Sequence, residues 1–382
     1  MENNNSVCFV SRINEIKIIE GADNIEQAVI GGWNCIIKKN EYNVNDLVVI
    51  ATTDAVIPQG LSDAMNVTNY LRKGGRVRII KLRGVYSECL IIPITYVQGV
   101  KRVEGADVME MLGIFKYEPP AKQIQLASGR KIKYHENPNF NVYHKFPNIK
   151  NVKNMFNEGD EVQITRKIHG TNTRYGIVRK NKLSIWDKVR IYLNIKFNLG
   201  GDEWKWSEYE FIVGSHNVEK GSDSQGFYNT NVWYEIANKY EIKKKLWELI
   251  KKGTFSKEDI GNGIIIYGEI YGVGIQQNYD YGLKTIEFAL FDIMINNQYI
   301  STDAVLTLHK LLELNHVPLL YIGPWSQHKL DLLSMNNFID NTKIPHEGIV
   351  VKSIDGNRQK IAKVINPDYL IYAEKKDVGD SH

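Results

Sequence analysis

The sequence predicts an α+β protein in which a small β-barrel precedes a larger domain rich in antiparallel sheet. Two observations predict this order. The first 115 residues consist of short β-rich runs separated by glycines, and from about residue 160 similar runs alternate with helical segments. The 382 residues leave room for two or three domains, and the composition, 43% hydrophobic and 24% charged, excludes collagen-like and wholly disordered chains.

Residues 1–116 form the first predicted domain. Their β-rich runs are short, glycines punctuate them, and no long helical period intervenes. A small closed barrel is the most economical arrangement for such strands, and an OB-fold is one barrel of this kind. The runs are 7–19, 27–38, 46–51, 76–81 and 89–94.

A polar segment containing four prolines, 117–150, is predicted to connect the barrel to the second domain, 151–382. In the second domain both helical spacing and apolar runs occur, which predicts mixed helices and strands. The predicted helices cover 231–252, 303–314 and 327–337. The predicted strands cover 263–270, 285–293, 348–352 and 359–364.

Positive charge is concentrated in two segments, although the net charge of the chain is only +4. Segment 71–84 contains six basic residues and no acid, and 117–153 contains seven basic residues and two acids. Such segments suit sequence-independent contact with a phosphate backbone, but a solvated lysine-rich surface explains each of them equally well. The candidates for nucleic-acid contact are Arg72, Lys73, Arg76 and Arg78.

The sequence offers no membrane or export signal that we recognise. No apolar run approaches the roughly 18–20 residues of a membrane span, and the Asn-rich start lacks the apolar core of a secretory signal. The three cysteines are far apart and form no CxxC pair, so we expect neither a zinc ribbon nor a disulfide framework. We therefore expect an intracellular protein, cytoplasmic or nuclear, and a viral gene is compatible with this expectation.

The most informative stretch is Lys167-Ile168-His169-Gly170-Thr171-Asn172, which reads as the end of a strand, a tight glycine turn and the start of another strand. A lysine at such a strand end can face a pocket. The pattern K-x-x-G alone is weak, and it recurs at Lys81 to Gly84, which we interpret as a coincidence in the barrel.

Four further segments follow Lys167 in order and add carboxylates, an aromatic residue and lysines. They are the strand ending in Glu269, the strand containing Phe291 and Asp292, the run from Glu347 to Lys352, and the run from Lys360 to Lys363.

With these five motifs in this order, the chain resembles the covalent nucleotidyltransferase superfamily of polynucleotide ligases and capping enzymes. The motif K-x-H-G-T-N, rather than K-x-D-G, resembles the RNA ligase branch. Together with an N-terminal OB domain, the pattern is similar to the Deinococcus-type ATP-dependent RNA ligases, and the resemblance covers nearly the whole chain. It implies an antiparallel-sheet-rich, ATP-grasp-like ligase domain that follows the barrel.

The resemblance also implies roles for residues. Lys167 would be the nucleophile, Glu269 would hold the ribose hydroxyls, Phe291 would stack on adenine, and Asp292 would organise its strand. Glu347 would bind Mg²⁺ or Mn²⁺ directly or through water. The implied catalytic residues are Lys167, Glu347, Lys352 and Lys363. The implied nucleotide contacts are these four residues and Ile168, His169, Asn172, His216, Glu269 and Phe291, and Thr171 would contact nucleic acid.

These residue types suit the chemistry. A lysine amine must be uncharged to attack the α-phosphorus of ATP, whereas a free lysine has a pKa of roughly 10.4. Nearby cations lower a lysine pKa, so we expect Lys352, Lys363 and a bound Mg²⁺ to assist the nucleophile, to bind the triphosphate and to stabilise transition-state charge.

Three positions depart from the family pattern. Arg166 precedes the nucleophile, where the family often has an acid. His216 stands before Asn217, where the family usually has arginine, so its contact to phosphate or ribose would depend on pH. Lys360 and Lys363 are three residues apart, whereas related ligases often have lysines two apart, so Lys363 is the stronger candidate.

The predicted function is therefore an ATP-dependent RNA ligase that acts on a nicked duplex with RNA at the 3′-hydroxyl side. It would work through lysyl-AMP and an adenylylated 5′ end, and we expect a monomer that does not bind membranes. The alternatives are a DNA ligase, a capping-type guanylyltransferase and a nucleic-acid-binding protein without catalytic activity. The first two usually carry K-x-D-G, and a barrel with basic segments would suffice for the third.

Overall fold

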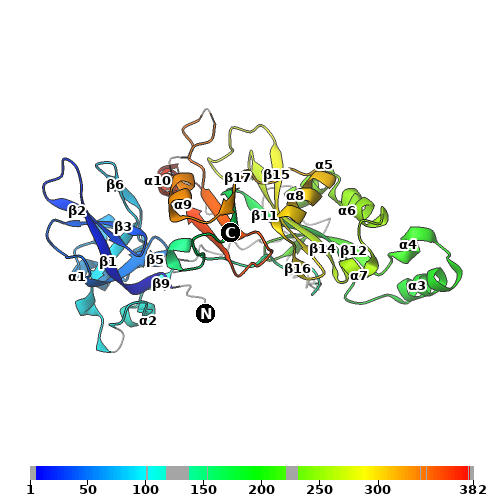
Figure 1. Ribbon diagram of the computed structural model, residues 1–382, viewed down its shortest axis with the longest axis horizontal. Coiled ribbons are helices and arrows are strands. Elements are labelled where there is room, and N and C mark those ends of the chain that lie inside the picture. Colours follow the sequence, from blue (N-terminus) through cyan, green and yellow to red (C-terminus); the bar gives the residue numbers. More distant parts are fainter. Residues whose placement is uncertain are drawn as a thin grey trace, which may run out of the picture. The chain divides into compact units, whose positions relative to one another are not determined.

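The computed structural model describes residues 6–99, 102–117, 137–152, 154–220, 231–335, 337–340, 342–376 and 378. The chain divides into two compact units (Figure 1). The first unit comprises 1–121, 147–155 and 364–372, and the second comprises 122–146, 156–363 and 373–382. Most of the predicted connector lies outside the described residues. Its end, 147–150, belongs to the first unit, as does 364–372 from the C-terminal region.

The first unit contains a five-stranded sheet in the order β3-β2-β1-β4-β8, with antiparallel pairing between neighbours. The beginning of β1 pairs with β4 and its end pairs with β2, with a bulge between Ile13 and Glu15, and a bulge of this kind bends and twists a sheet. The strands are β1 (Cys8–Ile18), β2 (Ile25–Ile30), β3 (Trp33–Lys38), β4 (Leu47–Thr52) and β8 (Cys89–Pro93).

The core of the first unit lies on both faces of β4. Val48 and Ile50 pack into one apolar cluster, and Val49 and Ala51 pack into another. Alternate residues of a strand point to opposite faces, so this interior strand is apolar from Leu47 to Ala51, as its sequence LVVIAT shows. The smaller elements are β5 (Ala55–Val56), β6 (Ile80–Leu82), β7 (Val85–Ser87), β9 (Phe115–Lys116), α1 (Gln59–Ala64) and α2 (Met109–Leu112). The predicted β-rich, barrel-like first domain is confirmed.

The second unit contains two sheets. The six-stranded sheet has the order β13-β12-β11-β14-β15-β16, and the four-stranded sheet has the order β17-β10-β18-β19. The strands of the first are β11 (Thr171–Arg179), β12 (Tyr209–Ser215), β13 (Glu219–Lys220), β14 (Gly263–Gly272), β15 (Ile286–Ile295) and β16 (Gln298–Tyr299). The strands of the second are β10 (Glu161–Lys167), β17 (Leu319–Pro324), β18 (Gly348–Ser353) and β19 (Ile361–Ile365).

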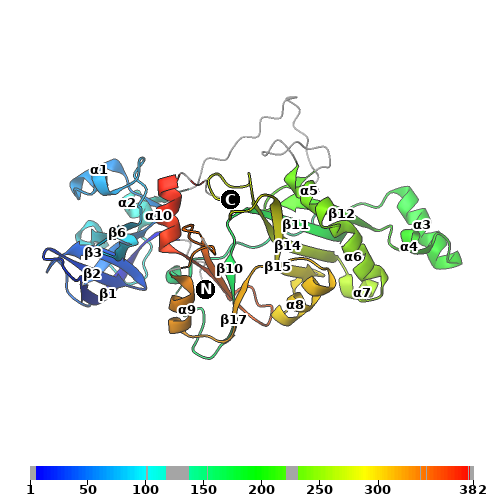
Figure 2. The same cartoon turned by 90° about the horizontal axis from the view of Figure 1, so that it is seen from above.

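Helices cover one face of the six-stranded sheet (Figure 2). They are α5 (Val232–Lys239), α6 (Ile242–Lys251), α7 (Lys257–Ile260) and α8 (Thr302–Leu311). The prediction of one continuous helix over 231–252 is wrong. The chain breaks at Tyr240 and Glu241, where Glu241 adopts a left-handed φ of 50°, so that Ile236 on α5 and Leu246 on α6 both reach the core. Two further helices are α9 (Gln327–Ser334) and α10 (Pro367–Lys376), the latter divided between the two units.

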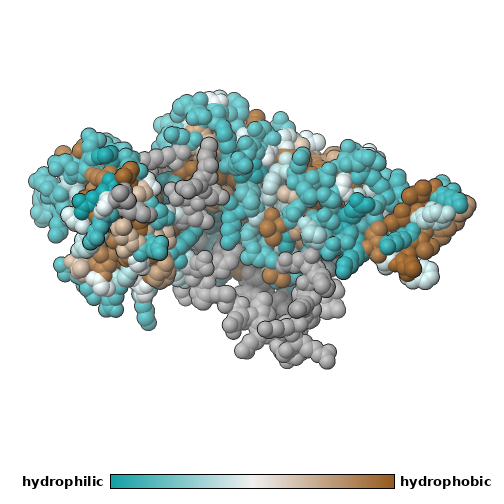
Figure 3. All heavy atoms as spheres, turned by 90° about the horizontal axis from the view of Figure 1, so that it is seen from below, coloured by the Kyte–Doolittle hydropathy of each residue, from teal (hydrophilic) through white to brown (hydrophobic). Residues whose placement is uncertain are grey.

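A helical hairpin of α3 (Ile185–Phe197) and α4 (Gly201–Lys205) is inserted between β11 and β12 and projects from the sheet. Its apolar side chains gather on the surface, as Figure 3 shows, and they include Ile185, Trp186 and Ile195, which are 73%, 69% and 80% exposed. Asp187, by contrast, is buried and pairs with Lys180. Among the described residues, no helix has the length and apolar character to cross a bilayer.

Candidate active site

Lys167 ends β10 at the point where the two sheets of the second unit connect. The chain then turns through Ile168, His169 and Gly170 into β11, which belongs to the other sheet. Gly170 is required at this turn because an added Cβ would overlap the carbonyl oxygen of Ile270 on β14. The glycine of the motif therefore allows the loop to lie directly against β14.

Side chains from the loop before β15 fix this turn. The His169 backbone N–H donates to the hydroxyl of Tyr281 at 2.6 Å, and the Gln276 amide donates to the Gly170 carbonyl at 2.5 Å. His169 itself is 1% exposed, and its ring stands perpendicular to that of Tyr279. The loop is thus anchored on its protein side, and Lys167 remains 21% exposed.

Glu347 is the partner of Lys167. The lysine Nζ lies 2.5 Å from Glu347 Oε1, and His169 Nδ1 lies 3.8 Å from Glu347 Oε2. This arrangement follows from strand register, because Lys167 of β10 lies opposite Gly348 of β18, directly after Glu347. The structure therefore brings together two residues that are 180 positions apart in the sequence.

Glu347 also fits a divalent cation. Its Oε2 is buried and has no hydrogen-bond partner in the part of the chain that the structure describes. No group of three His, Cys, Asp or Glu side chains among the described residues could hold a metal ion alone. Mg²⁺ usually takes one or two carboxylates and completes its shell with water and substrate phosphate, which is what this single carboxylate offers.

Glu269 lies on β14 opposite Asn172 of β11 and Ala289 of β15. Burial raises the pKa of Glu269 to about 8, with Lys167 opposing the rise and Glu347 adding to it. The carboxyl group is therefore largely protonated at neutral pH. Lys167 and Glu347 both act on the charge of Glu269, so the structure brings these three predicted site residues together.

Phe291 occupies a bulge in β15. Asp292 lies opposite Tyr267 of β14 and Leu290 lies opposite Gly268, which leaves Phe291 as the extra residue. A bulge redirects a side chain, and Phe291 is half-buried against Tyr143, with ring centroids 5.0 Å apart, and against the cluster that contains Ile168. An aromatic side chain is thus held beside the loop that follows Lys167.

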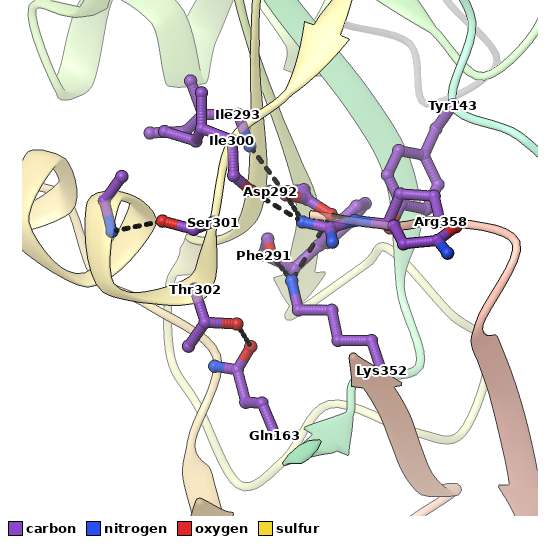
Figure 4. Close-up of polar contacts among 12 residues, drawn as sticks. Tyr143, Gln163, Phe291, Asp292, Ile293, Ile300, Ser301, Thr302, Lys352 and Arg358 are labelled. Atoms are coloured by element: carbon purple, nitrogen blue, oxygen red, sulfur yellow. Dashed lines mark hydrogen bonds and ion pairs between the residues drawn. The ribbon is translucent and has the colours of Figure 1, made fainter. Parts of the chain in front are cut away.

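Lys352 contacts the strand that contains Phe291 and Asp292 rather than the carboxylates beside Lys167. Its Nζ donates to the Phe291 carbonyl at 2.9 Å and lies 3.3 Å from Asp292 Oδ2 (Figure 4). In the register of β10 and β18, Lys352 lies opposite Gln163, four residues before Lys167. At about 3.3 Å per residue the two backbones are roughly 13 Å apart along the strands. The charge that contacts Lys167 is the carboxylate of Glu347.

Two residues that bind Asp292 together with Lys352 were not predicted from the sequence. Arg358, in the turn between β18 and β19, donates to both oxygens of Asp292 at 2.7 Å, and the Tyr143 hydroxyl donates to Oδ2 at 2.9 Å. Burial alone would raise the pKa of Asp292, but Lys352, Arg358 and Tyr143 outweigh it and hold that pKa below its usual range. Arg358 and Tyr143 lie outside regular strands, so no periodicity marks them.

The remaining predicted site residues lie on several different elements. Lys363 is half-buried on β19, and Lys360 forms a partly exposed ion pair with Asp160 at 2.8 Å. Burial lowers the pKa of His216, just after β12, and the nearby Lys145 and Arg174 lower it further. Thr171 and Asn172 begin β11 beside Glu269.

The basic segment of the first unit is partly engaged by the protein itself. Arg76 pairs with Asp54 at 3.1 Å, Arg78 donates to the Tyr70 carbonyl at 3.0 Å, and Lys73 is exposed. Lys81 lies 3.6 Å from Asp368, and its Nζ donates to the Tyr86 hydroxyl at 2.8 Å. The second K-x-x-G lysine thus belongs to a surface ion pair of the first unit, and a role for Arg72, Lys73, Arg76 and Arg78 in nucleic-acid contact stays a prediction.

Comparison with solved structures finds the same fold at low sequence identity. The Naegleria gruberi RNA ligase with pyrophosphate matches with a TM-score of 0.69 and 22% identity, over 97% of this chain and 99% of that chain. A mutant of that ligase with ATP and Mn matches with a TM-score of 0.69 and 23% identity, over 97% and 99%. An apo mutant matches with a TM-score of 0.70 and 23% identity, over 96% and 98%.

Family models match both parts of the chain. A model described as an OB-fold domain matches residues 7–94, which cover the five-stranded sheet of the first unit. Among curated proteins, none matches the sequence significantly. The RNA ligase model matches residues 160–365, more than half of the chain and the whole span from β10 to β19. The Deinococcus-type subfamily stays a prediction, but the chain belongs to the RNA ligase family.

Proposed function

We propose that the protein is an ATP-dependent RNA ligase that joins 5′-phosphate and 3′-hydroxyl ends through a lysyl-AMP intermediate. The observation that carries the proposal is the position of Lys167. It is a partly exposed lysine at a strand end, next to Glu347 and Glu269, and Phe291 packs against the cluster that contains the following residue, Ile168. The RNA ligase neighbours described above include complexes with ATP and Mn and with pyrophosphate, which supports ATP and a divalent cation as cofactors here.

The first step would be attack of Lys167 Nζ on the α-phosphorus of ATP. The N–P bond forms, the bond from the α-phosphorus to the bridging oxygen breaks, and pyrophosphate leaves. The amine must lose a proton, and Glu347 Oε1, 2.5 Å away, is the oxygen placed to accept it. Loss of the lysine charge would also end the ion pair that holds Glu347.

The surrounding residues would bind and orient the nucleotide. Phe291 would stack on adenine, and Glu269, with its raised pKa, could both donate and accept hydrogen bonds at the ribose. Lys352 and Lys363, on adjacent strands, would attract phosphate oxygens. Glu347 would hold the divalent cation, which when bound neutralises phosphate charge.

In the later steps AMP would move to the 5′-phosphate end, and a 3′-hydroxyl would displace it and seal the strand. We infer a nicked duplex with RNA at the 3′-hydroxyl side as the substrate. The resemblance of the motifs and the OB-fold match to residues 7–94 support this inference.

Labelling with ATP tests the proposal. Protein incubated with α-labelled ATP and Mg²⁺ or Mn²⁺ should acquire acid-labile label, and α-labelled GTP should give little. Lys167→Ala should lose the label. Lys81→Ala should keep it, because Lys81 and its partner Asp368 both belong to the first unit, whereas Lys167 belongs to the second. Label retained by Lys167→Ala would contradict the site, and preferential labelling by GTP would favour a capping enzyme.

A series of nicked duplexes identifies the substrate. RNA or DNA is placed on each side of the break, and the sealed product is measured by gel electrophoresis. We expect sealing to require RNA at the 3′-hydroxyl side. Equal sealing of an all-DNA nick would replace this specificity with that of a DNA ligase.

A further inference from the structure

Asp292 is the centre of a buried ion network in the second unit. The residue is fully buried, and the side chains of Arg358 and Lys352 are each 4% exposed (Figure 4). Oδ1 accepts from Arg358 Nη2 and from the Ile293 backbone N–H, and Oδ2 accepts from Arg358 Nε, Tyr143 and Lys352. Five donors therefore compete for one carboxylate.

The charges in this network do not cancel. One carboxylate faces two cations, and the ion pairs recorded for Arg358 and Lys352 both end on Asp292. A net positive charge enclosed by protein is costly unless an anion neutralises it. The network therefore has capacity for one further negative charge.

The hydrogen-bond distances to Asp292 indicate which of its two cations, Arg358 or Lys352, is less fully neutralised. Arg358 makes two bonds of 2.7 Å in the bidentate arrangement that is strongest for guanidinium and carboxylate, whereas Lys352 lies 3.3 Å from Oδ2 and makes its shorter bond to a neutral carbonyl. Arg358 thus neutralises most of the charge of Asp292, and the charge of Lys352 is the one left partly unneutralised.

We propose that Arg358 is a positioning residue for nucleotide transfer, which neutralises Asp292 so that the charge of Lys352 remains available to phosphate oxygens of the nucleotide. This inference rests on the proposed function and adds to it a residue that the motifs do not contain. Arg358 touches no reacting atom in this scheme. It acts through Asp292 on Lys352, and also on Phe291, whose carbonyl accepts from Lys352.

The pH dependence of ATP binding should reveal this coupling. Burial, opposed by Asp292 and reinforced by Arg358, lowers the pKa of Lys352 to about 8. The charged or titratable groups near Lys352 are Asp292 on β15, Arg358 in the β18–β19 turn and His316 before β17, and Tyr143 and Tyr299 lie near the same ion pair. The KM for ATP should therefore rise above about pH 8, as Lys352 loses its proton.

Arg358→Met tests the coupling. Without Arg358, Lys352 alone pairs with Asp292. Asp292 then neutralises the charge of Lys352, and the pKa of Lys352 rises. We expect kcat/KM for adenylylation to fall roughly 10- to 100-fold, mostly through KM, as is typical when a supporting contact is removed. We also expect the rise of KM to move to higher pH. Loss of a merely structural residue would lower activity equally at every pH.

Two further variants keep the proposal testable if Arg358→Met folds poorly. Arg358→Lys keeps the charge, so the pH at which KM rises should stay near that of the wild type. Asp292→Asn combined with Arg358→Met removes the two opposing influences on Lys352 together and should restore most of the lost affinity for ATP. Thermal melting of each variant shows which ones are folded.

Lys239→Ala is the control, because Lys239 forms a partly exposed ion pair with Glu287 in the same unit, outside the nucleotide site, and should leave KM and its pH profile unchanged. An unshifted pH profile in Arg358→Met, or a double variant no better than the single one, would overturn the role of Arg358. Failure of the proposed function itself would look different, since the wild-type protein would then acquire no Lys167-dependent label from ATP.

Discussion

Two of the lysine–carboxylate pairs in the second unit, Lys167–Glu347 and Lys352–Asp292, differ in exposure and in charge balance. Lys167 is 21% exposed and forms its ion pair with Glu347, whereas Lys352 is 4% exposed and shares Asp292 with Arg358. In the first pair one lysine balances one carboxylate, and the lysine can leave it to reach a substrate. In the second pair the lysine is fixed and its charge is only partly neutralised. The difference separates a group suited to react from a group suited to bind.

The largest effect is expected for Lys167→Arg. The guanidinium retains the positive charge and the ion pair with Glu347, but it does not deprotonate in proteins and so cannot act as the nucleophile. We expect no labelled protein within detection, together with a melting temperature close to that of the wild type. Labelling of the variant at a wild-type rate would show that another lysine carries the adenylate.

Asp292→Ala should have the largest effect on stability. The substitution leaves Arg358 and Lys352 buried without a carboxylate, and breaking a buried pair in this way typically costs about 3–5 kcal/mol. Urea unfolding at neutral pH measures the loss. Glu347→Ala is the comparison, because its partner Lys167 is partly exposed and can be hydrated. A loss for Glu347→Ala as large as that for Asp292→Ala would remove the distinction between the two pairs.

Glu347→Gln should affect activity more than stability. The amide keeps the shape of the side chain but cannot take the proton of Lys167 or bind a divalent cation with a full charge. We expect roughly 10²- to 10⁴-fold slower adenylylation, the range usual for a lost general base. Single-turnover labelling with ATP at saturating Mg²⁺ measures the rate, and unchanged kinetics would assign proton transfer and metal binding to other residues.

Glu269 should make stability depend on pH. Its pKa is about 8 in the folded protein against 4.5 ordinarily, so between these values the folded state holds a proton that the unfolded state has released. This contribution to stability is present below pH 4.5 and is lost as the pH rises towards 8. Glu269→Gln removes the titrating group, so its melting temperature should fall less than that of the wild type between pH 5 and 8. Parallel melting curves for the two proteins would contradict the raised pKa.

Lys360→Ala should have the smallest effect, because a partly exposed and hydrated ion pair contributes little to stability. Its partner Asp160 lies before β10, outside both lysine–carboxylate pairs. Unfolding and labelling should both stay close to the wild type. A large loss of labelling would instead place Lys360 in the nucleotide site beside Lys363.

Much of the site could be predicted because its main groups lie in strands with recognisable flanks. The run from Asp160 to Gly176 identifies a strand, a glycine turn and a second strand, and the structure has β10 and β11 on either side of that turn. Glu269, Phe291 and Glu347 follow from the order of the motifs. The separation of Lys352 from Lys167 could not be read in this way, because it depends on the register of β10 against β18.

Helix continuity also escaped prediction. The apolar spacing over 231–252 fits a single helix, yet the structure has two helices that both pack into the core, with Glu241 in a left-handed conformation between them. Glycine is the usual residue for that conformation, so its absence there gave no signal. Helix α3 was not predicted, and its exposed apolar side could not be foreseen either, because the pattern of a sequence does not show whether protein covers an apolar face.

The sequence by itself determined the two-part α+β organisation, the RNA ligase motifs and the lysine that we propose as the nucleophile. These features are local, since they depend on side-chain alternation, turn residues and short-range spacing. Only the tertiary structure decided which carboxylate pairs with which lysine, and it added Arg358 and Tyr143, 66 and 149 residues from Asp292. The physical reason is that ion pairing in a buried site depends on distances of a few ångströms, which strand register and a bulge set, and no local pattern encodes them.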